Sequence, residues 1–337
     1  MAESEERAET YESYLQLNKI LTGVRRLSEV NGDPAHEEHL FIIVHQAFEI
    51  WFKQVLFDLD SVMVIFCMLA EGRGEEKDLN TIVSRLQRTK LIFKLVVQHF
   101  EIMETMAPLL FLEFRCHLGN ASGFQSEQFR MIEIKFGLAD KYRQEYGEQK
   151  YIESMKSDET IQRLKTATKQ ETLRDCVEKW LTCIADKNPG SWQHYTSTIG
   201  KMEEDEQKVF KDVLDEAVYN EHLKKGKRRL SHKGFIGALM ISLNRDKPGF
   251  SLPCQIIALL TDIDNLIMEW RHRHVQMVHR MIGSKAGTGG SSGYMYLKST
   301  VREDYRVFLD FSNLATYFVP RKQLFEEELL YLRMLSI

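Results

Sequence analysis

Long stretches of apolar residues spaced three and four apart dominate this 337-residue sequence, and only 6 prolines interrupt them. This spacing places the apolar side chains on one face of an α-helix, whereas a proline inside a helix removes a backbone hydrogen bond. Alternating polar and apolar runs, which are typical of strands, are nearly absent. We therefore predict an all-α protein, built as a large helical bundle. Helices are expected over residues 10–29, 36–70, 77–105, 125–147, 158–186, 192–216, 252–283, 301–317 and 321–335.

The stretch from about 140 to 232 is more polar than the rest of the chain and has shorter apolar groups. We expect it to be a helical insertion that leaves the main bundle, within one domain that spans residues 1–337. A basic run at 224–229 lies near its end. Such runs are common on protein surfaces, so we interpret this one as a solvated loop in preference to a localisation signal.

Charge and cysteine usage narrow the possible partners. A net charge of -4 and a pI near 6.3 give no field that would attract nucleic acid or an anionic membrane. The acidic N-terminus does not look like a secretory signal, and we find no apolar stretch suited to cross a bilayer. The 5 cysteines are scattered and never spaced as CxxC, which predicts neither a disulfide framework nor a thiolate zinc site. We expect a cytoplasmic protein with reduced thiols and no nucleic-acid or membrane partner.

Two histidines lie inside apolar helix faces. His274 falls in the middle of an apolar stripe on residues 263–282, and His45 lies in an aromatic-rich stripe on residues 41–63. A single histidine of this kind is usually a core residue bonded to a backbone carbonyl. Two of them among aromatic and methionine side chains favour a haem pocket, because an imidazole that binds haem iron needs a flat apolar slot around it.

Other histidines do not form a metal site with these two. His272 and His279 project from the opposite side of the helix that carries His274, where a solvated histidine belongs. His36 and His39 flank two glutamates but lack the four-residue spacing that places two zinc ligands on one helical face. We interpret that segment as a polar helix start.

Two further segments suggest a site for a small acidic ligand. Phe111 and Arg115 are one helical turn apart, so an aromatic wall and a guanidinium can face the same volume, and Ser122 follows in a helix break. An ordinary surface arginine would show the same spacing. The loop 287–293 is rich in glycine and serine and follows a helix, which fits a mobile lid carrying Thr288 as well as a plain connector. It lacks the flanking elements of a nucleotide-binding loop.

The segments that carry these features occur in a fixed order along the chain. They are His39-Leu40-Phe41-Ile42-Ile43-Val44-His45-Gln46, Trp51-Phe52-Lys53-Gln54, Phe114-Arg115, Ser122-Gly123-Phe124-Gln125-Ser126, Trp270-Arg271, His274-Val275 and Gly287-Thr288-Gly289-Gly290-Ser291-Ser292-Gly293-Tyr294. Each is weak alone. Together, from about residue 10 to residue 320, they resemble the tryptophan 2,3-dioxygenase family.

The resemblance implies a homotetrameric enzyme that carries one haem b in each subunit. Such an enzyme adds both atoms of O2 across the indole C2–C3 bond of L-tryptophan and gives N-formyl-L-kynurenine, the first step of tryptophan catabolism by the kynurenine route. By motif position, His274 is expected to be the proximal iron ligand. His45 is expected to be the distal histidine that accepts a hydrogen bond from the indole N–H.

The resemblance also assigns the expected substrate contacts. Phe41 and Phe111 are expected to wall the indole, and Arg115 to pair with the substrate carboxylate. Thr288 is expected to hold the amino-acid end, with Ser122 near the substrate and the haem edge. An N-terminal segment is expected to reach into the site of a neighbouring subunit through Tyr11, Tyr14 and Leu15.

The residues alone leave other function classes open. The same pocket could serve a haem-based sensor or carrier without turnover, and a helical interaction protein would need no haem. Within the dioxygenases, a specificity of the indoleamine type would give comparable activity on D-tryptophan, because the carboxylate clamp would then matter less.

Overall fold

The computed structural model describes residues 9–144, 152, 155–288 and 293–324 of the chain. Every regular element within these residues is a helix, which confirms the predicted all-α class. The α-helices are α1 (Tyr11–Leu15), α2 (Leu17–Leu21), α3 (Leu27–Val30), α4 (Glu37–Ala70), α5 (Glu76–Met103), α6 (Pro108–Arg115), α7 (Glu127–Phe136), α8 (Asp140–Gln144), α9 (Asp158–Ala167), α10 (Leu173–Lys187), α11 (Pro189–Gly200), α12 (Glu204–Gln207), α13 (Lys211–Leu214), α14 (Glu216–Lys224), α15 (His232–Leu243), α16 (Ser251–Ile282), α17 (Gly293–Ser299), α18 (Leu309–Asn313) and α19 (Arg321–Leu324). Short 3-10 helices are η1 (Cys116–Leu118), η2 (Gly123–Gln125), η4 (Lys208–Phe210), η5 (Glu303–Tyr305) and η6 (Leu314–Tyr317).

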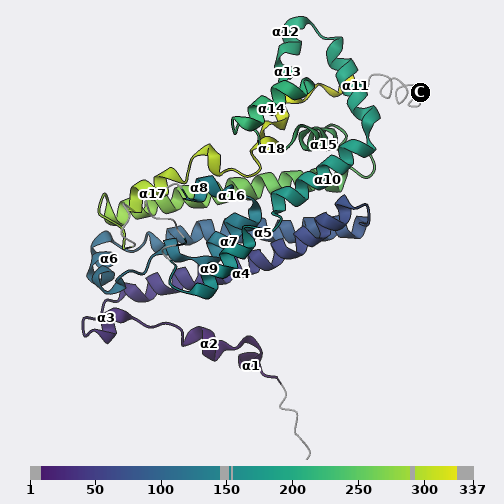
Figure 1. Cartoon of the computed structure of the whole chain (residues 1–337). Helices are drawn as coiled ribbons and strands as arrows, with labels where there is room; N and C mark the ends of the chain where they lie inside the picture. The colour runs from purple at the N-terminus through teal and green to yellow at the C-terminus, as the bar shows by residue number, and fades with distance from the viewer. Residues whose placement is uncertain (1–8, 145–151, 153–154, 289–292, 325–337) are drawn as a thin grey trace, which may run out of the picture.

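Three long helices form the centre of the bundle. Helix α5 packs against both α4 and α16, and the three run side by side in Figure 1. Each turns an apolar stripe inward, so that Phe52 and Leu59 of α4, Phe93 and Phe100 of α5 and Leu260 of α16 are buried in one core. Burial of these faces, rather than helix propensity, supplies most of the stability of such helices.

Helix α16 is also apolar enough, over a sufficient length, to cross a membrane by composition alone. This differs from the sequence expectation that no such stretch exists. Half of its most apolar window is buried inside the bundle, as is typical of the central helix of a water-exposed fold.

Shorter helices cover the centre. Helix α7 is capped by Ser126, whose hydroxyl accepts the Phe129 N–H at 3.2 Å, and it packs against α4. Helix α10 packs against both α4 and α15. Where α10 crosses α15, a side chain at Gly237 would collide with the Leu181 carbonyl, so only glycine permits this close approach.

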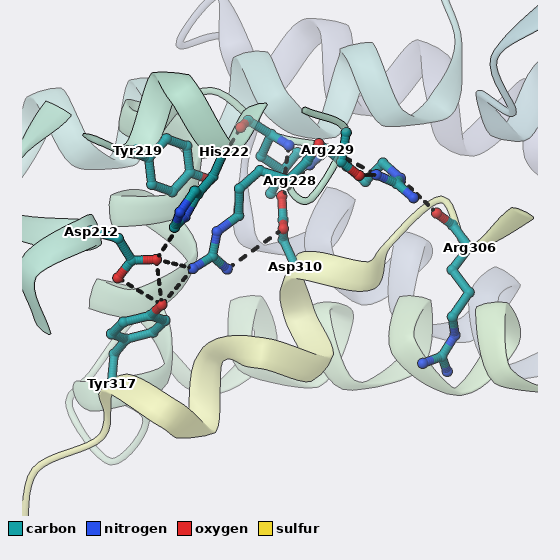
Figure 2. Close-up of polar contacts among 10 residues, drawn as sticks. Asp212, Tyr219, His222, Arg228, Arg229, Arg306, Asp310 and Tyr317 are labelled. Atoms are coloured by element: carbon teal, nitrogen blue, oxygen red, sulfur yellow. Dashed lines mark hydrogen bonds and ion pairs between the residues drawn. The ribbon is translucent and has the colours of Figure 1, made fainter. Parts of the chain in front are cut away.

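Helices α11 to α14 rise from one end of the bundle, above α10 and α15 in Figure 1. The basic run ends inside the protein, not in solvent. Figure 2 shows the Arg228 guanidinium between the carboxylates of Asp212, at 2.6 Å, and Asp310, at 3.8 Å, with the Tyr317 hydroxyl beside it. The prediction of a solvated loop is therefore wrong for Arg228, although Lys224, Lys225 and Lys227 are exposed.

Several helix boundaries differ from the sequence expectation. The predicted helix 10–29 is three short helices, because Gln16 takes a left-handed conformation with φ 53° between α1 and α2. The predicted helix 192–216 is also divided, since Glu203 is extended after α11 ends. Helices α6, α15 and α17 and most of α14 were not expected, and residues 325–335 of the helix expected over 321–335 lie outside the described residues. Almost the whole surface of α15 is buried, so its sequence shows no polar face from which a period can be recognised.

Candidate active site

A cavity opens at the end of the bundle where α6 and α17 lie, at the left in Figure 1. Its walls come from α4, α5, α6, α7, the C-terminal half of α16 and α17. Among the described residues, the cavity is lined by Phe41, Met103, Met106, Phe111, Arg115, Leu118, Ser122, Gly123, Phe124, Phe129, Arg130, Trp270, Arg271, His274, Met277, Val278, Met281, Ile282, Gly287, Thr288, Gly293, Tyr296, Leu297 and Thr300. Most are apolar, and the few polar ones converge on the same space.

His274 reaches this cavity from α16 and is half-buried. Its ring lies 5.1 Å from Trp270 and 5.9 Å from Phe100, measured between centroids. Burial, and then the nearby His45 and Arg271, lower its pKa to about 3. The imidazole is therefore neutral at pH 7, which is the form that can bind a metal ion. His272 and His279 are exposed, as the sequence predicts.

His45 packs against Phe41, with 4.2 Å between the ring centroids, and is not among the described residues that line the cavity. Its Nδ1 is 2.7 Å from the Phe41 carbonyl oxygen. A carbonyl only accepts hydrogen bonds, so Nδ1 must carry the proton. Burial lowers the pKa of His45, which keeps the ring neutral and leaves the lone pair on Nε2. This contact is the one expected of a core histidine. It also fixes the tautomer whose Nε2 can accept a hydrogen bond.

Arg115 and Thr288 connect the loop after α16 to the loop after α6. The Arg115 guanidinium donates to the Ala286 carbonyl, and the Thr288 hydroxyl donates to the Ala121 carbonyl at 2.7 Å. Ser122 caps η2 by accepting the Phe124 N–H. Residues 289–292 of the predicted lid lie outside the described residues.

A buried ionic cluster forms the polar wall of the cavity. Glu133 lies between two arginines: its carboxylate is 2.9 Å from Arg130 and also bonded to Arg271. The Tyr296 hydroxyl lies 3.0 Å from Arg130. Burial raises the pKa of Glu133, but the two arginines outweigh it and the net shift is downward. Among the described residues, two guanidinium groups and one carboxylate therefore form the charged wall of the cavity.

Neither Arg130 nor Arg271 is among the site residues predicted from the sequence. Their pairing with Glu133 joins α7 to α16 across 138 residues, so only the short Arg130-to-Glu133 spacing was visible in the sequence. Two further donors on this wall are buried and have no hydrogen-bond partner among the described residues, the indole N–H of Trp270 and Nε of Arg271. Such donors suit an acidic group within the cavity.

The N-terminal residues predicted for the site lie outside the cavity. Helix α1 carries Tyr11, Tyr14 and Leu15, whose exposed fractions are 77%, 76% and 37%. They do not line the cavity of their own chain. Six of the other predicted residues line it together, and His45 packs against one of them, Phe41.

Comparisons with known proteins identify the family of the chain. The family model described as tryptophan 2,3-dioxygenase matches residues 1–208 and 198–318. The chain is 42% identical to tryptophan 2,3-dioxygenase B of Danio rerio, over 92% of this chain and 82% of the relative. It is 42% identical to tryptophan 2,3-dioxygenase of Anopheles gambiae, over 93% and 86%, and 44% identical to that of Mus musculus, over 92% and 82%. The chain therefore belongs to the tryptophan 2,3-dioxygenase family.

Proposed function

We propose that this protein is a haem-dependent dioxygenase that adds both atoms of O2 across the indole C2–C3 bond of L-tryptophan, giving N-formyl-L-kynurenine. Family membership supports the reaction. The structural observation that carries the proposal is one cavity lined jointly by His274, Phe41, Phe111, Arg115, Ser122 and Thr288. They come from four segments of the chain, around residues 41, 111–122, 274 and 288, and meet only in the folded structure.

The residues of the cavity fit a haem. His274 supplies a neutral imidazole, while Trp270, Met103 and Met277 supply apolar surface. The guanidinium groups of Arg130 and Arg271 suit the carboxylates that a haem carries, as does the indole N–H of Trp270, which has no hydrogen-bond partner among the described residues. We propose that His274 would bind the iron of one haem b per chain. When bound, the haem supplies the iron that activates O2.

The other side chains would orient the substrate. Phe41 and Phe111, with centroids 5.8 Å apart, offer aromatic surfaces to an indole ring. His45, protonated at Nδ1, would accept the indole N–H at Nε2. Arg115 has five N–H donors, so the bond to Ala286 leaves donors for the substrate carboxylate. Thr288 would hold the amino-acid end.

The loop after α16 would exclude water from the reaction. The Arg115 bond to Ala286 and the Thr288 bond to Ala121 hold this loop over the cavity from two points. A substrate carboxylate that binds Arg115 would add a third contact. Closure over the substrate would keep water from the reacting atoms and from an oxidisable iron.

We also propose a homotetramer in which the N-terminal segment enters a neighbour's site. Exposed apolar residues support this assembly. On α4, Ile43, Ile50, Phe57 and Val64 recur every seventh residue and are 41%, 53%, 73% and 62% exposed. A stripe with this period is typical of helices that pair with another helix. Tyr11 and Tyr14 add exposed aromatic surface at the N-terminus.

Two broader proposals concern the whole chain. We treat it as one domain in which residues 140–232 form a helical insertion; α10, inside that range, packs against α4. We also place the enzyme in the cytoplasm. All five cysteines are free, and thiols persist in reducing compartments.

A single series of measurements tests the function. The purified, haem-loaded, reduced protein is mixed with L-tryptophan and O2, and formylkynurenine is followed by absorbance and mass. We expect stoichiometric product and incorporation of both oxygen atoms from labelled O2. Haem binding with a tryptophan-dependent spectral change but no product would identify a sensor or carrier instead, and would overturn the proposal.

A further inference from the structure

Two cysteines and a glutamate meet where the end of α4 packs against the start of α10. The sulfur of Cys67 lies 3.6 Å from the sulfur of Cys176 and 3.8 Å from a carboxylate oxygen of Glu171. All three potential ligand atoms lie within 4.8 Å of one another. Cys176 is buried, Cys67 is half-buried and Glu171 is exposed, so the cluster is open to solvent on one side.

These separations match those of a tetrahedral metal site. With Zn–S bonds of about 2.3 Å and a Zn–O bond of about 2.1 Å at tetrahedral angles, two sulfurs lie about 3.8 Å apart and a sulfur and an oxygen about 3.6 Å apart. The observed distances of 3.6 Å and 3.8 Å differ from these by about 0.2 Å each. A small rotation of two side chains would therefore bring all three atoms to one ion.

The surroundings favour a cation. A surface cavity covers the cluster, and its lining contains the carboxylates of Glu71, Glu171, Asp175 and Glu178 with Lys179 as the one basic side chain among its described residues. Arg174 approaches Asp175 at 3.3 Å from outside this lining. Cys67 also lies in the last turn of α4, where the helix dipole attracts positive charge.

The second oxygen of Glu171 is already held. Lys179 donates to Oε1, while Oε2 faces the sulfur of Cys67. A partner that fixes the free oxygen of a carboxylate orients the other toward a metal ion. The charges also balance: two thiolates and one carboxylate carry three negative charges, and a divalent ion with the Lys179 ammonium carries three positive ones.

We propose that Cys67, Cys176 and Glu171 bind a thiolate-seeking divalent metal ion, Zn²⁺ in the first place, at a site separate from the active-site cavity. The two thiols release their protons to solvent as the two sulfur–zinc bonds form, and no electron is transferred. The fourth position faces the acidic cavity and takes water. The ion would join α4 to α10 and stabilise the folded chain, because unfolding would break the site.

The test uses the haem-loaded full chain, kept reduced with a phosphine. Each protein is incubated with Zn²⁺ and dialysed, and the bound zinc is counted by mass spectrometry. Cys67→Ser, Cys176→Ser and Glu171→Gln change the site. Cys183→Ser is the matched control, because Cys183 is a half-buried thiol on the same helix, α10, outside the cluster.

We expect the wild type and C183S to retain one zinc per chain, and zinc to raise the melting temperature of both. Removal of either thiolate should abolish retention and the thermal shift, and E171Q should weaken binding by about tenfold. Replacement of zinc by Cd²⁺ should give a thiolate-to-metal absorption band in the wild type and C183S, and in E171Q only at higher Cd²⁺, but in neither C67S nor C176S. Should the substitution at the buried Cys176 prevent folding, that at the half-buried Cys67 still decides. The assignment is wrong if the wild type retains no zinc, or if C67S retains as much as C183S.

Discussion

The Nδ1 atom of His45 lies 2.7 Å from the carbonyl oxygen of Phe41, one turn earlier on the same helix. This bond fixes the tautomer of His45, and with it the position of the lone pair that we assign to the indole N–H. A surface histidine whose ring makes no such hydrogen bond would rotate freely. Here the backbone of α4 orients the ring before any substrate arrives.

Replacement of His45 by alanine should leave haem binding intact and lower kcat/KM for L-tryptophan by about ten- to a hundredfold, the cost of leaving a buried N–H unpaired. His39→Ala, at an exposed position of the same helix, should not change the rate. With N1-methyltryptophan, which has no indole N–H, the alanine variant and the wild type should differ far less. An equal loss on both substrates would contradict the role of His45 as acceptor.

The activity should fall on acidification and should not fall, through His45, on alkalinisation. Burial lowers the pKa of His45 below the ordinary 6.5, so the ring stays neutral at and above pH 6.5 and gains a proton only on further acidification. The rate attributable to His45 should therefore be level above pH 6.5 and fall as the pH drops through the lowered pKa. A pH–rate profile of kcat/KM, compared between wild type and His45→Ala, measures this contribution. A rise in wild-type activity on acidification would contradict it.

The guanidinium of Arg115 should set the preference for an amino acid over an amine. Arg115→Leu should raise KM for L-tryptophan by about ten- to a hundredfold, because a charged hydrogen bond is lost. Binding of tryptamine, which has no carboxylate, should change little, and this difference is the measurement. Arg280→Leu, at an exposed position near the end of α16, is the control. A parallel loss for both ligands would point to collapse of the loop instead.

The buried Arg228 should be far more important for stability than its basic neighbours. It pairs with Asp212 and Asp310 (Figure 2). Its guanidinium carbon also lies 4.9 Å from the centroid of the Phe235 ring. Arg228→Ala leaves the buried carboxylate of Asp310 and the half-buried one of Asp212 without their guanidinium, which should lower the free energy of unfolding by about 3–5 kcal/mol. Lys227→Ala removes an exposed charge and should change it by less than about 0.5 kcal/mol. Urea unfolding compares the two, and equal effects would show that the network contributes nothing.

A charge placed on the exposed stripe of α4 should disrupt the proposed tetramer. Phe57→Glu puts a carboxylate on a residue that is 73% exposed in the single chain. If this surface packs against another subunit, light scattering should show a smaller assembly. Val209→Glu, at a residue that is 52% exposed on the insertion, should leave the mass unchanged. An unaltered mass for Phe57→Glu would place the interface elsewhere.

The sequence predicted the parts of the fold that are amphipathic. Helices α4, α5 and α16 each bury one face, so their apolar period was visible and their positions followed from it. Helix α15 was missed because it is buried on nearly all sides. The break after α11 was missed because a change of backbone conformation at Glu203 leaves no trace in hydrophobic periodicity.

The site was predictable where its residues lie on a helical stripe or in a motif, as for His274 and Arg115. It was not predictable where partners meet across long separations. Arg271 bonds to Glu133, which is 138 residues away in the sequence, and Cys67 contacts Cys176, which is 109 residues away. The absence of CxxC spacing excluded only a zinc site built from one segment. Ligands drawn from two helices need the packing of α4 on α10, which no local pattern encodes.

The most direct test of the account is the visible spectrum of the reduced protein, for the wild type and for His274→Ala, with and without L-tryptophan. The wild type should show one haem per chain and a band that shifts when tryptophan binds. His274→Ala should fold normally by circular dichroism but lose haem, or hold it with an altered band and no activity, while His272→Ala should match the wild type. A haem spectrum and activity in His274→Ala equal to those of the wild type would contradict the assignment of His274 as the iron ligand.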